Sequence, residues 1–167
     1  MIVLAALCAG LGTAAIIDIR HRRIPNVVCV TTAFVGLGLS ILGVSPITVS
    51  SALAGLAFGF LMMLPGHVFG ATGAGDVKLF AAAGTLLGSG RIVTAFLFVA
   101  IAGGVLAVVI AIRRGRLERT MGLTTRLLGR RGKLKMEIES PAEHNRFSYG
   151  PAIAIGCIAA MLIGDSL

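Results

Sequence analysis

The chain has 167 residues, of which 56% are hydrophobic and 13% are charged, and its mean hydropathy is +0.96. Soluble domains are about 45–50% apolar, so this composition excludes an ordinary soluble protein and predicts membrane spans. The net charge of +8 predicts basic loops beside anionic lipid headgroups, and we expect no nucleic-acid partner because no basic surface with interleaved aromatic residues is visible.

Six apolar segments follow one another, and we interpret them as the spans of an all-α, polytopic membrane helix bundle. They cover residues 1–17, 27–44, 47–64, 77–90, 92–112 and 150–164. Nothing outside these segments is large enough to fold alone, so we expect a single membrane-embedded domain over residues 1–167. The fourth segment is the shortest, and it is therefore a candidate to begin within the bundle and not at the membrane surface.

The first apolar segment has to be distinguished from a secretory signal. Such a signal carries positive charge before its apolar run and a small-residue cleavage site after it. Here the basic cluster of Arg20, Arg22 and Arg23 follows the run. We therefore expect this first helix to be retained.

The basic residues predict the orientation of the bundle. With the N-terminus outside, the loops at 18–26, 65–76 and 113–149 face the cytoplasm. Fourteen of the fifteen Lys and Arg residues lie in or beside these loops, and Arg91 is the exception. The positive-inside rule then places both termini outside a bacterial inner membrane. Within the basic loop 113–149, residues 117–128 suggest an amphipathic helix on the inner leaflet or a solvated linker.

Of the seven acidic residues, the four glutamates lie in the loop 113–149 and Asp165 is two residues from the C-terminus. That leaves Asp18, which ends the first span, and Asp76, which precedes the fourth. A carboxylate near hydrocarbon costs about 2.5–3.5 kcal/mol at a helix centre on insertion scales, so such a residue is a functional candidate. Both acids are expected at the cytoplasmic boundary. If their helices are neighbours, the two carboxyl groups can meet across a water and share a proton, as hydrolysis of a peptide bond without a metal requires.

Each acid also has a structural interpretation. Asp76 can cap the fourth helix. Asp18 opposes the dipole at the end of its helix and can be neutralised by Arg20 or Arg22. Spacing alone therefore leaves ion pairing and proton transport open beside catalysis. The alternative function is a small proton-coupled membrane transporter, and a non-catalytic subunit of a secretion complex is a third.

The local sequence around each acid narrows these choices. Residues 73–78 read Gly-Ala-Gly-Asp-Val-Lys. Glycine permits unusual backbone conformations and the close approach of an extended substrate, although an ordinary glycine turn has the same pattern. Asp18 is followed by residues 20–23, which are basic apart from one histidine. Next come Pro25, which stops the first helix, and Asn26, which can cap the second.

Together these segments resemble the type IV prepilin peptidase family, the GxGD aspartyl proteases. The family has an Asp at the first inside loop, followed by a basic stretch and Ile-Pro-Asn, and later Gly-x-Gly-Asp with a Lys two residues on. Residues 18–26 and 73–78 match in order and spacing, and residues 147–154 resemble the segment leading into the last span. The resemblance covers most of the chain, and the combination is specific although each piece is weak alone.

The resemblance implies that Asp18 and Asp76 are the catalytic pair. It implies that further residues form the active-site loop or bind substrate, namely Gly73, Gly75, Lys78, Pro25 and Asn26. The implied enzyme is an aspartic endopeptidase that cleaves the leader of type IV (Flp-like) prepilins or pseudopilins at the cytoplasmic membrane face. No cofactor is implied, and membrane lipids would surround the helices.

Cysteine usage bears on a second activity of the family. Larger members carry a cytoplasmic region with paired zinc-binding cysteines, associated with N-methylation of the mature pilin. Here Cys8, Cys29 and Cys157 lie far apart in apolar segments, so we expect no metal site and no disulfide, but buried small side chains. Almost nothing precedes the first span. We therefore expect cleavage without methylation, as in the short peptidases of tight-adherence (Flp) pilus systems.

Overall fold

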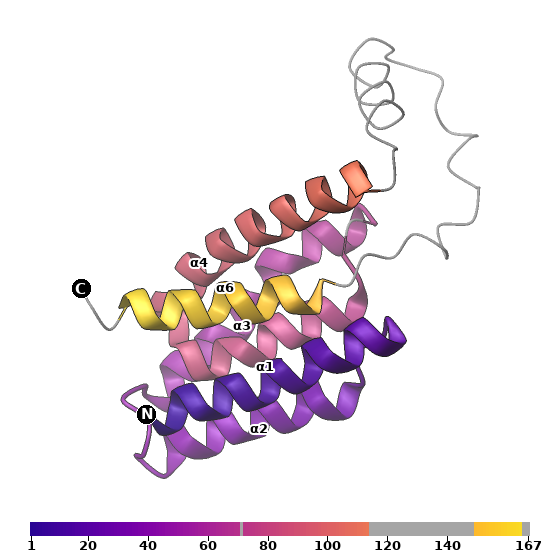
Figure 1. Ribbon diagram of the computed structural model, residues 1–167. Coiled ribbons are helices and arrows are strands. Elements are labelled where there is room, and N and C mark those ends of the chain that lie inside the picture. Colours follow the sequence, from indigo (N-terminus) through magenta and orange to yellow (C-terminus); the bar gives the residue numbers. More distant parts are fainter. Residues whose placement is uncertain (71, 114–148, 165–167) are drawn as a thin grey trace. The chain divides into compact units, whose positions relative to one another are not determined.

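The computed structural model describes residues 1–70, 72–113 and 149–164. These residues form the helices α1 (Ile2–His21), α2 (Asn26–Ile41), α3 (Val49–Val68), α4 (Ala74–Arg113) and α6 (Gly150–Gly164) (Figure 1). The described part contains no strand, and the expectation of an all-α polytopic membrane bundle is confirmed. The chain divides into two compact units, one of residues 1–103 with 148–167 and one of residues 104–147. The packing below is that of the first unit.

The long helix α4 consists of two helices joined at Gly88, where φ is 72° and ψ is 174°. This backbone conformation is essentially restricted to glycine. Phe80 before the break and Phe96 after it face one another, with ring centroids 6.1 Å apart. The fourth and fifth predicted segments are therefore both present, but the break lies at Gly88 and not at Arg91. The charge of Arg91 suggested a loop, whereas this residue already belongs to the second helix.

Successive helices run in opposite directions, which gives the unit two distinct ends. The first, called the aspartate end below, is made by residues 18–26, 72–76 and 149–150. Contacts of Gly75 with Ile24 and of Gly150 with Asp18 join these segments. The three loops that the sequence places on one side of the membrane, 18–26, 65–76 and 113–149, each contribute residues to this end.

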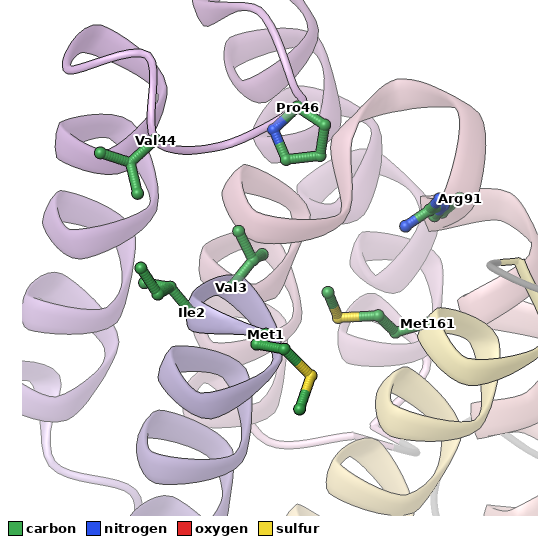
Figure 2. A pocket seen from close by; sticks show the side chains of 7 residues that line it. All are labelled: Met1, Ile2, Val3, Val44, Pro46, Arg91 and Met161. Carbon is green, nitrogen blue, oxygen red and sulfur yellow. The ribbon is translucent and has the colours of Figure 1, made fainter.

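The other end of the unit brings together the start of α1, the α2–α3 connection and the turn at Gly88. Figure 2 shows a pocket of about 270 Å³ at this end. It is lined by Met1, Ile2, Val3, Val44, Pro46, Arg91 and Met161. Asp18 lies seventeen residues along α1 from Met1, about 25 Å away at the rise of an α-helix. The pocket is therefore remote from both aspartates.

Close helix packing positions the elements of the unit. The helix α1 packs against α2 and α6, which lie on either side of it (Figure 1), and α2 packs against α3. The helices α3 and α4 meet backbone to backbone at Gly55 and Gly84, where a Cβ on either residue would overlap the carbonyl oxygen of the other. Such small-residue contacts are typical of helix pairs in membranes, where lipid gives no hydrophobic driving force for association.

The lengths and outer faces of these helices fit a bilayer. Three described stretches are long and apolar enough to cross a membrane, namely 2–21, 49–68 and 74–106, the last of which is divided at Gly88. Asn26–Ile41 and Gly150–Ile163 are shorter apolar helices. Large apolar side chains remain exposed, for example Phe34 at 69% and Ile101 at 63%. Contact of large apolar side chains with water is unfavourable, whereas contact with lipid is not, so these faces indicate a membrane protein.

Two helices continue four residues past the predicted ends of their segments. The helix α1 continues past residue 17 to His21, so that Asp18 lies within the helix. The helix α3 continues through Pro65 to Val68 because the Pro65 carbonyl still accepts a hydrogen bond from the Phe69 N–H at 3.0 Å. The possible amphipathic helix at 117–128 lies outside the described residues.

Candidate functional site

Asp76 lies in the first turn of α4 and is only 6% exposed. The Gly73 carbonyl precedes the helix and accepts hydrogen bonds from the N–H groups of Asp76 and Val77, at 3.1 and 3.3 Å. The Asp76 carboxylate reaches back, and Oδ2 accepts a hydrogen bond from the Gly73 N–H at 2.8 Å. This is the return half of a capping box, in which an acid also faces the positive end of the helix dipole. Asp76 therefore helps to cap α4, as one interpretation of the sequence expected.

The two glycines before Asp76 create space and not an unusual turn. A Cβ on Gly73 would lie 3.1 Å from Asp76 Oδ2, and a Cβ on Gly75 would lie 3.1 Å from the Cβ of Ile24. Neither glycine is among the described residues with positive φ. The sequence suggested that these glycines admit a substrate strand. The close approaches that they allow in the structure are made by Asp76 and Ile24.

Asp18 lies in the last turn of α1 and is 5% exposed. Its Oδ2 accepts a buried hydrogen bond of 2.9 Å from the N–H of Gly150, the first residue of α6. The first N–H groups of a helix have no partner within the helix and carry the positive end of its dipole. The sequence pointed to Arg20 or Arg22 as the group that neutralises Asp18. The structure adds the start of another helix, which offsets the unfavourable dipole of α1.

The segment between α1 and α2 links the two acids. The N–H of Arg22 donates to the Asp18 carbonyl at 2.8 Å and ends α1 in a left-handed conformation, with φ at 52°. Pro25 is extended and occupies the N-cap position of α2. The expectation that Asn26 caps α2 is wrong, because Asn26 is the first helical residue and its Oδ1 accepts a hydrogen bond of 3.0 Å from Lys78 Nζ.

The cysteines occupy different environments. Cys29 and Cys157 are buried as expected, but Cys8 is exposed, because it lies on an outer face of α1. Cys29 Sγ lies 3.9 Å from the carbonyl oxygen of Gly75, so it contacts the segment that leads into Asp76. Within the described part of the chain, no group of three or more His, Cys, Asp or Glu side chains could hold a metal ion.

The seven candidate site residues all lie at or next to the aspartate end. They are Asp18, Pro25, Asn26, Gly73, Gly75, Asp76 and Lys78. Direct hydrogen bonds join Gly73 to Asp76 and Lys78 to Asn26, and Asp18 is joined to this group through the short segment 22–26. Two buried carboxyl groups at one end of a helical bundle can perform acid–base chemistry.

Sequence reasoning did not assign a site role to three residues that contact this group: Ile24, Cys29 and Gly150. Nothing in the pattern around Ile24 or Cys29 indicates their contacts with Gly75. Gly150 belongs to the segment 147–154 that carries the family resemblance, and its position before Pro151 at the start of an apolar run is a signal for a helix N-terminus.

Comparison with known proteins gives two matches. The family model described as the type IV leader peptidase family matches residues 5–108. A protein of Bacillus subtilis (strain 168) named prepilin leader peptidase/N-methyltransferase is 30% identical over 156 residues, which cover 92% of this chain and 52% of the relative. The chain thus spans about half the length of that curated relative. No solved structure matches the chain.

Proposed function

Since this chain belongs to the type IV leader peptidase family, we propose that it is a membrane aspartyl endopeptidase that cleaves the leader of type IV prepilins or pseudopilins. The observation that carries this proposal is the placement of Asp18 and Asp76. Both acids are buried at the same end of the bundle, although 57 intervening residues separate them in the sequence. Each carboxylate accepts a hydrogen bond from a glycine N–H.

The proposed chemistry uses the two carboxyl groups as one unit. Carboxyl groups that are close together do not both ionise freely, so one keeps a proton while the other is charged. The charged group takes a proton from a water molecule, and that water attacks the carbonyl carbon of the scissile peptide bond. The protonated group donates its proton to the carbonyl oxygen. When the C–N bond then breaks, the leaving amine receives the proton that the first group took from water, and the second group regains its proton as the new carboxyl group forms. No metal and no covalent intermediate take part.

The distribution of charge supports cleavage at the cytoplasmic face. Among the basic residues of the first unit that the structure describes, Arg20, Arg22, Arg23 and Lys78 lie at or near the aspartate end, and Arg91 lies at the other end. By the positive-inside rule, the aspartate end faces the cytoplasm of a bacterial inner membrane, with the N-terminus outside. A substrate would keep its leader at this face while its apolar helix lies in the bilayer.

The substrate proposed is a Flp-like prepilin, and the activity proposed for these residues is cleavage alone. The name of the Bacillus relative includes N-methyltransferase, and larger members of the family carry paired cysteines for that activity. The cysteines of this chain are at positions 8, 29 and 157, and no two of them are close enough in sequence to form such a pair. A proton-coupled transporter would need acids near the middle of the bilayer, and the placement of both aspartates at one end supports the peptidase instead.

Co-expression with candidate prepilins from the same genome tests this function, with the loss of the leader scored as a mobility shift. The wild-type protein should convert the precursor. Asp18→Ala and Asp76→Ala should each reduce conversion by about 10²–10⁴-fold, the usual contribution of a general acid or base, while both variants remain in the membrane. Asp165→Asn is the matched control, since the proposal gives this acid no role. Full processing by either Ala variant would rule out the catalytic pair.

A further inference from the structure

We propose that Gly150 is a positioning residue for Asp18, so that the N-terminus of α6 is a third part of the active site beside α1 and α4. This proposal rests on the catalytic role proposed for Asp18. Gly150 lies outside residues 5–108, which carry the family match. The inference follows from one long-range hydrogen bond, the space around it and the packing of two helices.

The hydrogen bond joins the last described helix to the first. Gly150 N donates to Asp18 Oδ2 at 2.9 Å, and the two residues are separated by 132 positions in the sequence. The helices α1 and α6 pack side by side (Figure 1), which fixes the distance between donor and acceptor. Since Pro151 has no N–H, it offers no competing donor at the next position. The bond is buried, where an N–H donor to a carboxylate gives strong and directional orientation.

The space at this position favours glycine, because an added Cβ would be in tight contact with Asp18 and α1. A Cβ on residue 150 would lie 3.0 Å from Asp18 Oδ2, 3.1 Å from the Asp18 Cβ and 3.4 Å from the Cα of Ala15. The Ala15 contact is with the backbone of α1, which does not yield easily. Any side chain at residue 150 would therefore displace the Asp18 carboxylate or push the start of α6 away from it.

The arrangement at Asp18 repeats the one at Asp76. In both cases Oδ2 of the carboxylate accepts a hydrogen bond from a glycine N–H at the start of a helix, and a Cβ on that glycine would come within 3.1 Å of the same oxygen. For Asp76 the glycine is three residues away, whereas for Asp18 it comes from a different helix. The orientation of Asp18 therefore depends on the docking of α6 against α1.

A kinetic comparison separates positioning from folding. Purified Gly150→Ala protein in proteoliposomes should show kcat lowered about three- to tenfold with KM nearly unchanged, because a misplacement of about 1 Å costs on the order of 10²-fold and the shift needed here is smaller. The control is Gly156→Ala, on the same helix. Its Cβ would lie 2.5 Å from Val99 Cγ2 and 2.6 Å from the Val99 backbone N, a tighter fit far from Asp18.

The two variants should show opposite patterns. Gly156→Ala should lower the thermal stability and leave the kcat of the folded protein near the wild-type value. Gly150→Ala should lower kcat and change the thermal stability less. If Gly156→Ala is not recovered from the membrane, Gly12→Ala on α1 replaces it, because its Cβ meets no atom within 4 Å. A wild-type kcat for Gly150→Ala, or an equal kcat loss in the control, would overturn the proposal.

A second measurement does not depend on any substrate. In protein labelled with ¹⁵N-glycine in detergent micelles, the amide resonance missing from Gly150→Ala identifies Gly150. Asp18→Ala removes the acceptor, so it should shift this resonance and speed its exchange with D₂O, and Asp76→Ala should not. An unchanged Gly150 resonance in Asp18→Ala contradicts the positioning role. A shifted resonance in Asp18→Ala, together with wild-type protein that cleaves no prepilin, would instead contradict the proposed function alone.

Discussion

Asp18 and Asp76 occupy opposite ends of their own helices, and their energetics differ accordingly. Asp76 lies in the first turn of α4, where a negative charge is favoured by the helix dipole, whereas Asp18 lies in the last turn of α1, where it is disfavoured. The N–H of Gly150 donates a hydrogen bond to the Asp18 carboxylate, as the N–H of Gly73 does to the Asp76 carboxylate. The two acids thus reach the same kind of hydrogen bond by a long-range and a local route.

The capping role and the proposed catalytic role of Asp76 can be separated by substitution. Asn keeps a side-chain oxygen that can accept the Gly73 hydrogen bond, whereas Ala removes it. Asp76→Ala should lower the free energy of unfolding by about 0.5–2 kcal/mol, the usual cost of a lost cap, and Asp76→Asn should lower it by much less. Both variants should lose cleavage, because an amide cannot transfer the proton.

Denaturant unfolding in detergent micelles, followed by circular dichroism, measures the stability, and the prepilin assay measures the activity. Active Asp76→Asn protein would show that capping is the whole role of this residue. Asp76→Asn as unstable as Asp76→Ala would show instead that the charge, and not the hydrogen bond, stabilises the start of α4.

Among the elements, α4 has the most unusual feature, since its two helices reverse direction at Gly88. The backbone there has φ of 72° and ψ of 174°, and a Cβ would lie 2.8 Å from Ser51 Oγ and 3.0 Å from Ile47 Cγ2. The Ser51 hydroxyl accepts a hydrogen bond from the Ser89 N–H at 3.2 Å, which ties the turn to α3. Conformation and space therefore both require glycine at residue 88.

Substitution at this turn gives a prediction with a control two residues away. Gly88→Ala should lower the free energy of unfolding by about 1–3 kcal/mol, the cost of a strained backbone. Gly90 is helical and a Cβ there meets nothing within 4 Å, so Gly90→Ala should be neutral or stabilising by up to about 1 kcal/mol. Thermal unfolding of the two variants in the same detergent measures the difference, and equal melting temperatures would contradict this account of the turn.

The sequence predicts the elements better than it predicts their ends. Apolar length identifies every helix of the described residues, and the segment 150–164 coincides with α6. The break in α4 was displaced to Arg91 because a charge suggests a loop, while the backbone needs the glycine three residues earlier. The third apolar segment was expected to end at residue 64, but Pro65 removes only one N–H donor and α3 continues to Val68.

The candidate site was predictable where its contacts are local. The motif of residues 73–78 contains both Asp76 and the glycine that donates to it. The hydrogen bond of Asn26 with Lys78 spans 52 positions, and that of Asp18 with Gly150 spans 132. No periodicity or propensity encodes such pairs, because they arise only when the helices pack. The hydrogen bond between Gly150 and Asp18 could therefore be identified only from the structure.

For the whole molecule, alternation of helix direction is what brings the site together. The helices α2 and α3 separate the end of α1 from the start of α4, so the chain crosses the bundle twice and Asp76 returns to the end where Asp18 lies. The reversal at Gly88 then allows α6 to begin beside Asp18. The pocket lined by Met1 and Arg91 lies at the far end, remote from the proposed catalytic pair. On the proposed function, substrate should approach the aspartate end, with its apolar helix against the exposed apolar faces of the bundle.

The rate of leader cleavage by purified Asp18→Asn, Asp76→Asn and the double variant tests the central claim most directly. Residues that act as one catalytic unit lose their effects non-additively. We predict that each single variant falls to the same residual rate as the double variant, measured on a synthetic prepilin peptide in proteoliposomes. A near-wild-type rate from either single variant, or two partial losses that multiply in the double variant, would contradict a shared catalytic centre.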